Sequence, residues 1–239
     1  MSSLIGTGLL AEYQDLFTSS ATAGGMIPGN KAMTGDGREF RFVLAGATAL
    51  VPGKLQQSAA EDTTNWENLA VAAAAIGATT VVTTTTITAA ANLFAGGYLQ
   101  VTVTPGQGYS YRIKGNTAAT TAACTITLED PILVALTTAS RIDIVPNTFN
   151  NVIVNPTTAT GTIVGSAIFA VTAAQYGWVQ TKGIANVLAQ GTIVVGEQVA
   201  ASSTTAGAVV ATSGVLADVG YAVTGVATTE YGSIFLNIS

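Results

Sequence analysis

The chain of 239 residues contains no histidine and a single cysteine. Without histidine, neither a Ser-His-Asp nor a Cys-His catalytic arrangement can be assembled, and His-based zinc or iron sites are excluded. The lone cysteine, Cys124, excludes both an intramolecular disulfide and a cysteine-cluster metal site within one subunit. It lies at an alternating position in "AACTITLED", which predicts a small buried hydrophobic residue. We therefore expect no catalytic, cofactor-binding or metal-binding residues, and no enzyme.

Charge is also scarce. Charged residues make up 9% of the chain, against about 25% in an ordinary globular domain. Disordered chains are hydrophilic and highly charged, so this composition does not indicate disorder. Interface cores are depleted of Lys, Glu and Asp, which favours burial in an assembly over a charge-poor monomer. Residues 176–210, with only Lys182 and Glu197 charged, are the clearest case.

Basic residues are few and scattered. The net charge is −5 with eight Lys and Arg residues, whereas nucleic-acid binding requires clustered positive charge. Only the pairs Arg38/Arg41 and Arg112/Lys114 lie close together in sequence. Solvated strand or turn faces explain both pairs better than phosphate binding does, so no nucleic-acid partner is expected.

No membrane partner is expected either. Residues 68–111 carry no charge, but this stretch is rich in threonine, is interrupted by Gly96-Gly97 and alternates in polarity. These features favour strands over a membrane-spanning helix. The N-terminal "MSSLIGTGLLAEYQ" has no basic segment before its short apolar run, so it does not resemble an export signal.

Alternating polarity and regularly spaced turn residues predict an all-β fold, namely an extended N-terminal arm followed by two small modules resembling β-barrels or sandwiches. The arm covers residues 1–35, with one helical turn near "LLAEYQDLF". The first module covers 36–145 and includes a short helix over 62–75 capped by Asp62 or Thr63. A strand is the alternative for that helix. The second, barrel-like module covers 146–239, after a Pro- and Asn-rich boundary at 146–161.

The expected strands alternate buried and exposed side chains. In "REFRFVL", Phe40, Phe42 and Leu44 are expected to face the core, and Glu39, Arg41 and Val43 to lie on the other face. The further strands are expected at 79–88, 98–104, 109–114, 124–128, 132–136, 141–145, 162–172, 176–181, 185–189, 192–195, 207–212, 219–225 and 231–238. Core candidates in the charge-poor stretch are Trp178, Val187, Leu188, Ile193 and Val195.

The remaining candidate chemistry is weak. Glycoside hydrolysis needs two carboxylates about 5 to 9 Å apart, and the available pairs are Glu61/Asp62 and Glu129/Asp130. Adjacent residues on a strand point to opposite faces, so neither pair converges, and "LEDP" favours a strand-ending turn. "GDGRE" lacks the further ligands of a calcium loop and predicts a turn at Asp36.

Aromatic residues could form a stacking groove for sugars or single strands, although core or interface packing is favoured. The candidates are Tyr98, Tyr109, Tyr111, Tyr176, Trp178, Tyr221, Tyr231 and Phe235.

Six segments occur together in one order: "GDGREFRFVLAGATALVPGKL", "GYSYRIKGN", "LEDPILVAL", "VNPTTATGTIVG", "YGWVQTKGIANVLAQGTIVVGEQV" and "VGYAVTGVATTEYGSIFLNI". With these segments, residues 36–238 resemble capsid decoration (cement) proteins of tailed bacteriophages. The resemblance implies a structural virion protein, assembled in the host cytoplasm, that binds the capsid outer surface. Its implied partners are the major capsid protein, whose subunit contacts it stabilises, and sister copies, as a homotrimer.

Three alternatives remain open. A tail or fibre component that binds host glycans would also be β-rich and oligomeric. A depolymerising glycosidase would need converging carboxylates, and a surface-layer or adhesin module would need an export signal. We expect the N-terminal arm to lie along the capsid or a sister subunit, so that its deletion leaves the β modules folded.

Overall fold

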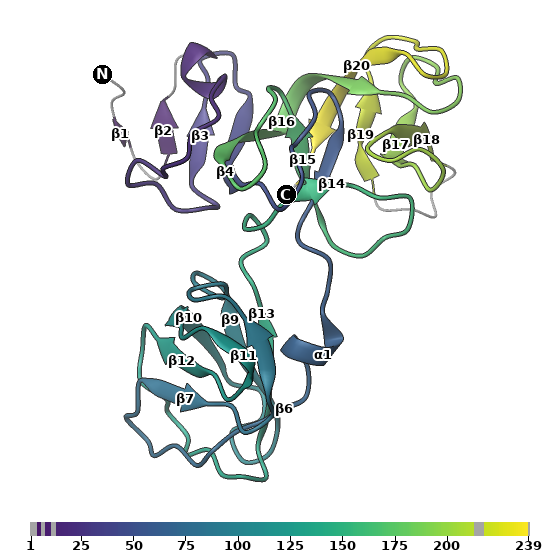
Figure 1. Cartoon of the computed structure of the whole chain (residues 1–239). Helices are drawn as coiled ribbons and strands as arrows, with labels where there is room; N and C mark the ends of the chain where they lie inside the picture. Colours follow the sequence, from purple (N-terminus) through teal and green to yellow (C-terminus); the bar gives the residue numbers. More distant parts are fainter. Residues whose placement is uncertain (1–3, 6–7, 11–12, 213–217, 239) are drawn as a thin grey trace. The chain divides into compact units, whose positions relative to one another are not determined.

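The computed structural model of the chain describes residues 4–5, 8–10, 13–212 and 218–238. Strands account for 44% of the residues and helices for 3%, which confirms the all-β fold class. The chain forms two compact units (Figure 1). Unit 1 comprises Met1–Ala60 and Thr148–Ser239, and unit 2 comprises Glu61–Asn147.

Unit 2 is a curled sheet built from one continuous segment. A six-stranded sheet runs in the order β6-β13-β9-β10-β12-β7, and β8 pairs separately with β11. The strands are β6 (Leu69–Ala70), β7 (Thr80–Val82), β8 (Ile87–Ala89), β9 (Tyr98–Val103), β10 (Ser110–Asn116), β11 (Ala119–Ala122), β12 (Thr125–Leu128) and β13 (Arg141–Val145). A bridge between Val71 and Thr83 brings the two ends of the sheet together. The resulting ring encloses a single apolar core that includes Phe94 and Cys124, so the predicted burial of the cysteine is confirmed.

The helix predicted over 62–75 is correct at its start and wrong at its end. Asp62 caps α1 (Thr63–Trp66), because its Oδ1 accepts hydrogen bonds from the backbone N–H groups of Thr64 and Asn65. The chain then enters β6 with Leu69 and Val71 buried. The alternating burial of these two side chains outweighs the helix propensity of the alanines that follow.

Two further predicted strands are absent from the described residues, at 132–136 and 192–195. In each segment only one residue makes a strand-like bridge: Leu136 with Ala74, and Ile193 with Val226. Trp178, Val187 and Ile193 are buried as predicted, and Leu188 is half-buried. Val195 is 62% exposed, because it lies in a tight turn that reverses at Gly196 rather than in a strand.

Unit 1 is organised around one long strand, β16 (Tyr176–Leu188). Its sheet follows the order β1-β2-β3-β4-β16-β20-β19-β17-β18, with β15, β5 and β14 branching from β16. The other strands are β1 (Leu4–Ile5), β2 (Gly8–Leu10), β3 (Lys31–Met33), β4 (Glu39–Leu44), β5 (Leu55–Gln57), β14 (Ile153–Val154), β15 (Ile163–Ala167), β17 (Gln198–Ala201), β18 (Val209–Ala211), β19 (Asp218–Ala222) and β20 (Tyr231–Asn237).

The first half of β16 belongs to what we call the first ring. Here β16 pairs with β4 on one side and β15 on the other, and β5 and β14 continue the ring. A bridge between Ala45 and Val152 closes it. Small and branched side chains fill the interior, among them Val43, Val164 and Val179. Val43 was assigned to the outer face of its strand, and its burial is a correction caused by this ring closure.

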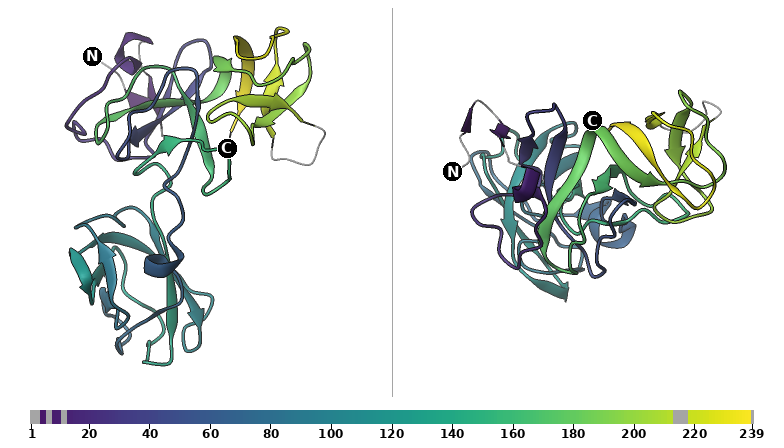
Figure 2. Two further views of the ribbon diagram at one scale, coloured as in Figure 1. Left: turned by 45° about the vertical axis from the view of Figure 1, so that its right-hand side comes forward. Right: turned by 90° about the horizontal axis from the view of Figure 1, so that it is seen from above.

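The second half of β16 belongs to the second ring, with β20, β19, β17 and β18. A bridge between Ala189 and Val209 closes this ring around Val187, Val199 and Ile234. Figures 1 and 2 show β16 running from the strands of one ring into those of the other. The strands predicted at 176–181 and 185–189 are thus one strand serving two cores.

The division into modules differs from the expected one. We predicted that residues 36–145 fold together, but β4 pairs with β16 and β5 pairs with β14. Unit 2 is therefore inserted between two adjacent strands of unit 1. Two strands can pair however far apart they lie in sequence. The alternating polarity that begins near residue 36 therefore marks a strand of the first ring rather than a domain boundary.

The N-terminal arm is also corrected, for residues 13–35. The helical turn near "LLAEYQDLF" is present as the 3-10 helix η1 (Tyr13–Leu16), and β3 pairs with β4. Leu16 and Ala32 are fully buried in a cluster with Phe40, Phe42 and Trp178. This segment covers the outer side of β4 and β16, because the aromatic side chains on that side would otherwise be exposed to water. The parts of the predicted arm at 1–3, 6–7 and 11–12 lie outside the described residues.

Candidate functional site

The two predicted carboxylate pairs do not form a catalytic pair. Asp62 caps α1, and its Oδ2 accepts a hydrogen bond from the Asn65 side chain at 2.6 Å. Glu129 forms an ion pair with Arg112, with 3.1 Å between Oε1 and Nε. Within residues 14–212 and 219–238, no three Asp, Glu or Cys side chains come together as a metal site.

A different acidic contact, missed in the sequence, joins Glu67 to Glu61. Protonated Glu67 donates a hydrogen bond to Glu61, which raises the pKa of Glu67, with smaller contributions from desolvation and from the charges of Glu61 and Asp143. Asp143 accepts the backbone N–H of Asn68 at 2.8 Å, which ties β13 to the turn after α1.

The basic residues are used locally, as their sequence context indicated. Arg38 Nε lies 2.7 Å from Asp36 Oδ2 in the predicted turn, and the hydrogen bond from Thr34 lowers the pKa of Asp36. Arg41 donates to the carbonyl of Gly29 and lies over the ring of Phe149, 5.6 Å from its centre. These residues present no row of cations along a surface.

The aromatic candidates divide between core and surface. Trp178 and Tyr111 are buried, and the hydroxyl of Tyr111 accepts the backbone N–H of Leu133. The tyrosines at 98, 109, 221 and 231 are 41–45% exposed. They lie in two units, and the two cavities described below contain at most one of them.

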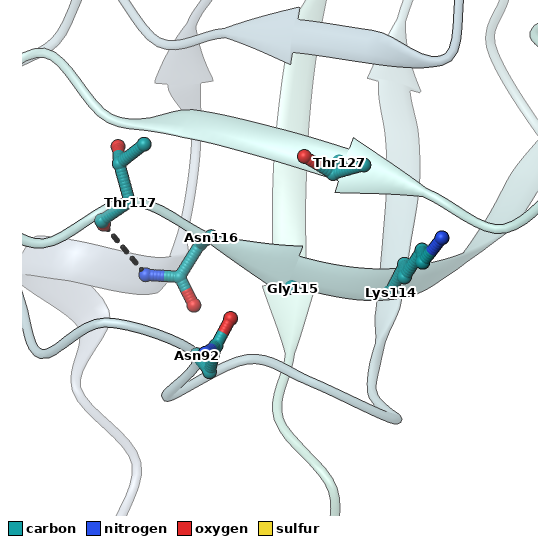
Figure 3. Close-up of a pocket in the computed structure, with 6 residues that line it drawn as sticks. All are labelled: Asn92, Lys114, Gly115, Asn116, Thr117 and Thr127. Atoms are coloured by element: carbon teal, nitrogen blue, oxygen red, sulfur yellow. Dashed lines mark hydrogen bonds between the residues drawn. The ribbon is translucent and has the colours of Figure 1, made fainter.

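A shallow cavity of about 340 Å³ lies in unit 2 beside β10 (Figure 3). The side chain of Asn116 spans its floor and is fully occupied: its amide donates to the carbonyls of Ala90 and Thr117, and its oxygen accepts the N–H of Phe94. Figure 3 shows Lys114 projecting away from Asn92 and Asn116. The cavity therefore gathers neither reactive groups nor several cations.

A second cavity, of about 360 Å³, lies in unit 1 where the two rings meet along β16. Gln180, which is 1% exposed, lies in its wall and donates through Nε2 to the carbonyls of Lys182 and Ile184, each at 3.0 Å. The ring of Tyr231 packs against Gly53, whose φ of +70° and lack of a side chain leave room for it. Ile184 and Tyr231 line both this cavity and the surface beside it.

That surface lies on the outer side of the second ring. Register places Ile184 opposite Phe235, and Phe235 opposite Tyr221. The rings of Tyr221 and Phe235 stack with centres 5.0 Å apart. Ile184 is 53% exposed and Tyr221 is 45% exposed. Four residues further along each strand, about 13 Å away, Leu188 lies opposite Tyr231, and the polar pair Asn186 and Ser233 lies between.

We call this surface the outer apolar face; it consists of Ile184, Leu188, Tyr221, Tyr231 and Phe235. The alternation in "KGIANVL" carried a signal for it, because a strand with one buried face must present Ile184 on the other. The sequence interpretation explained the missing charge at 176–210 by burial in an oligomer. For residues 177–181, burial within the chain itself suffices, whereas Ile184 remains uncovered.

No family model, curated protein or solved structure matches this chain. The functional interpretation therefore depends on its own residues. In the described part of the chain, no helix is long and apolar enough to cross a membrane.

Proposed function

We propose that this chain is a non-enzymatic structural protein of a tailed-bacteriophage virion, which binds the outer surface of the capsid as an oligomer. In that role it stabilises contacts between major capsid subunits. The main support for the proposal is the outer apolar face, on which Ile184, Tyr221 and Tyr231 are 53%, 45% and 45% exposed. Large apolar side chains gathered on an exposed surface mark protein interaction sites.

Two further observations support a binding role. The carboxylate pairs available for hydrolysis serve as a helix cap and an ion pair. The segments with which the chain resembles decoration proteins lie largely on the strands of unit 1 and on β10. Capsid stabilisation would work by multivalency, because binding at one point makes the later contacts effectively intramolecular.

The test is binding to empty capsids of a tailed bacteriophage that have been stripped of decoration protein. Capsids are mixed with increasing amounts of the purified chain and sedimented, and the bound copies are counted against the major capsid protein. We expect saturation at a fixed ratio that matches the capsid symmetry, and capsids that withstand higher temperature. Absence of saturable binding would contradict the proposal.

The role of the N-terminal segment changes with the structure. Because residues 13–35 cover an aromatic cluster of unit 1, their deletion cannot report on capsid binding alone. A surface substitution that leaves this cluster intact is the appropriate probe.

A further inference from the structure

The cavity of about 360 Å³ at the junction of the two rings of unit 1 combines a buried polar wall with an exposed aromatic ring. Its volume falls within the range of small-molecule sites, about 300–1,000 Å³. Of the five residues of the outer apolar face, only Ile184 and Tyr231 line it. The rest of the wall includes Arg38, the turn at Pro52 and Gly53, and the end of β15.

One wall of the cavity presents a hydrogen-bond acceptor of fixed orientation. Gln180 is 1% exposed, and its Nε2 donates to the carbonyls of both Lys182 and Ile184. Among the described residues, no donor reaches its Oε1. This oxygen is not sealed from solvent, unlike the side-chain oxygens of Gln56 and Gln57. Because the amide nitrogen is occupied, Gln180 offers the cavity an acceptor only, and a ligand beside it must donate a hydrogen bond.

Two further side chains at the cavity can contact a ligand. Asn186 is exposed, and its side chain makes no hydrogen bond to any described residue. Its amide can therefore both donate and accept. Tyr231 packs against Gly53, and 45% of its surface is exposed. The negative face of an aromatic ring attracts the slightly positive hydrogens of C–H groups.

Charge at the cavity is balanced. Arg38 is the one charged residue among the described residues that line it, and its Nε lies 2.7 Å from Asp36 Oδ2. A cation would meet the guanidinium, and an anion would meet the unpaired oxygen of Gln180, so the site favours neither. A suitable ligand is neutral, carries hydroxyl groups that both donate and accept, and presents C–H groups to an aromatic ring. Carbohydrates combine these three properties.

We infer that this cavity binds a carbohydrate. Oε1 of Gln180 accepts a hydrogen bond from one sugar hydroxyl, and the amide of Asn186 binds another. Tyr231 contacts the C–H groups of the sugar ring. The inference goes beyond the proposed function and does not depend on it.

An NMR titration of the full chain with methyl glycosides of glucose, galactose, mannose and N-acetylglucosamine tests the site. We expect at least one glycoside to cause saturable amide shifts that cluster at Gly53, Ala167 and Ala185, with none in residues 61–147. Sodium acetate and tetramethylammonium chloride are the charged controls and should leave these amides unshifted. Absence of saturable shifts with every glycoside, or tighter binding of either charged control, would overturn the inference.

Two matched pairs of substitutions test the residues. Tyr231 and Tyr221 are each 45% exposed, and only Tyr231 lines the cavity. Asn186 and Asn237 are both exposed on paired strands, and only Asn186 lines the cavity. We expect Tyr231→Ala and Asn186→Ala each to weaken glycoside binding about two- to tenfold. Tyr221→Ala and Asn237→Ala should leave it unchanged.

Circular dichroism confirms that each variant is folded, and Asn186→Ala decides the test if the loss of the Tyr231 ring unfolds the chain. Glycoside binding that is equal in Asn186→Ala and Asn237→Ala would overturn the position of the site. The outcomes also separate this inference from the proposed function. A chain that binds a glycoside but no capsid supports the inference and contradicts the proposed function, and a chain that binds capsids but no glycoside does the reverse.

Discussion

Unit 2 and unit 1 contain the same kind of short-stranded ring, but they are assembled differently. Unit 2 uses one continuous segment around one core. Unit 1 combines two segments that are distant in sequence. Its buried apolar side chains form separate clusters on either side of β4 and along β16. Its first ring also buries Gln56 and Gln57, and among the described residues no donor reaches their side-chain oxygens. A buried polar atom without a partner costs stability.

The two units are therefore sensitive to damage at different places. Contacts distant in sequence form slowly, because loop-closure entropy is lost before they form. In unit 1 both rings depend on β16, so damage to this strand should affect both. Unit 2 closes on itself and should fold whether or not unit 1 does.

Among the variants that test this comparison, we expect the deletion of residues 1–35 to have the largest effect on stability. The deletion uncovers Phe40, Phe42 and Trp178, each of which contributes up to about 3 kcal/mol when buried. The total approaches the stability of a typical domain, about 5–15 kcal/mol. We expect unit 1 to lose cooperative folding while unit 2 stays folded. In amide NMR spectra, the dispersed signals should match those of residues 61–147 expressed alone; persisting dispersed signals from β16 would contradict the expectation.

A smaller effect is expected from single truncations in the two cores. Trp178→Ala in unit 1 and Phe94→Ala in unit 2 each remove a buried aromatic ring and should each cost about 3–5 kcal/mol. Denaturant unfolding can be followed in each unit separately, because Trp66 lies in unit 2 and Trp178 in unit 1. We expect Phe94→Ala to shift only the Trp66 transition. In Trp178→Ala, Trp66 should unfold as in the wild type; a shifted Trp66 transition would mean that the units unfold together.

The strand shared by the two rings provides a third test. Gly183 follows the bulge at Gln180–Lys182 and has a φ of +90°, and an added Cβ would lie 2.7 Å from Cγ of Arg38. Gly183→Ala should therefore cost about 1–2 kcal/mol, mostly through the backbone conformation. Gly35→Ala is the control, because an added Cβ there meets nothing within 4 Å. Equal midpoints for the two variants would show that the bend tolerates a side chain.

The same glycine shows what the sequence could predict and what it could not. Alternation located most strands and the burial of Trp178 and Cys124, because period-two burial is a local property, and the residue type of Asp62 located its cap. It could not show that 176–181 and 185–189 are one strand, since Gly183 resembles a turn. Strand partners such as β4 and β16 could not be predicted from the sequence either, because pairing depends on which apolar surfaces, distant in sequence, bury one another. The outer apolar face was visible as alternation, but its stacked pair Tyr221 and Phe235 required the register of two strands.

The smallest expected effects come from acid titration, and they have opposite signs in the two units. The hydrogen bond from Lys31, aided by the charges of Lys182 and Arg41, lowers the pKa of Glu39 in unit 1. Its folded pKa lies below the unfolded value of about 4.3, so its contribution is present above that pH and is lost as pH falls through the folded pKa. Glu67 in unit 2 has a raised pKa, so unit 2 gains stability as pH falls toward about 4.3.

Two variants separate these signs. At pH 7, Glu39→Gln should lower the melting temperature of unit 1, since exposed ion pairs contribute about 0.2–1 kcal/mol. Glu67→Gln should slightly raise the melting temperature of unit 2, because it removes the repulsion from Glu61. Both differences should vanish below the folded pKa of Glu39, where each carboxyl is protonated in the folded and unfolded states alike. A melting temperature of unit 2 that falls in Glu67→Gln at pH 7 would contradict the repulsion, and the acidic contact would then stabilise its ring.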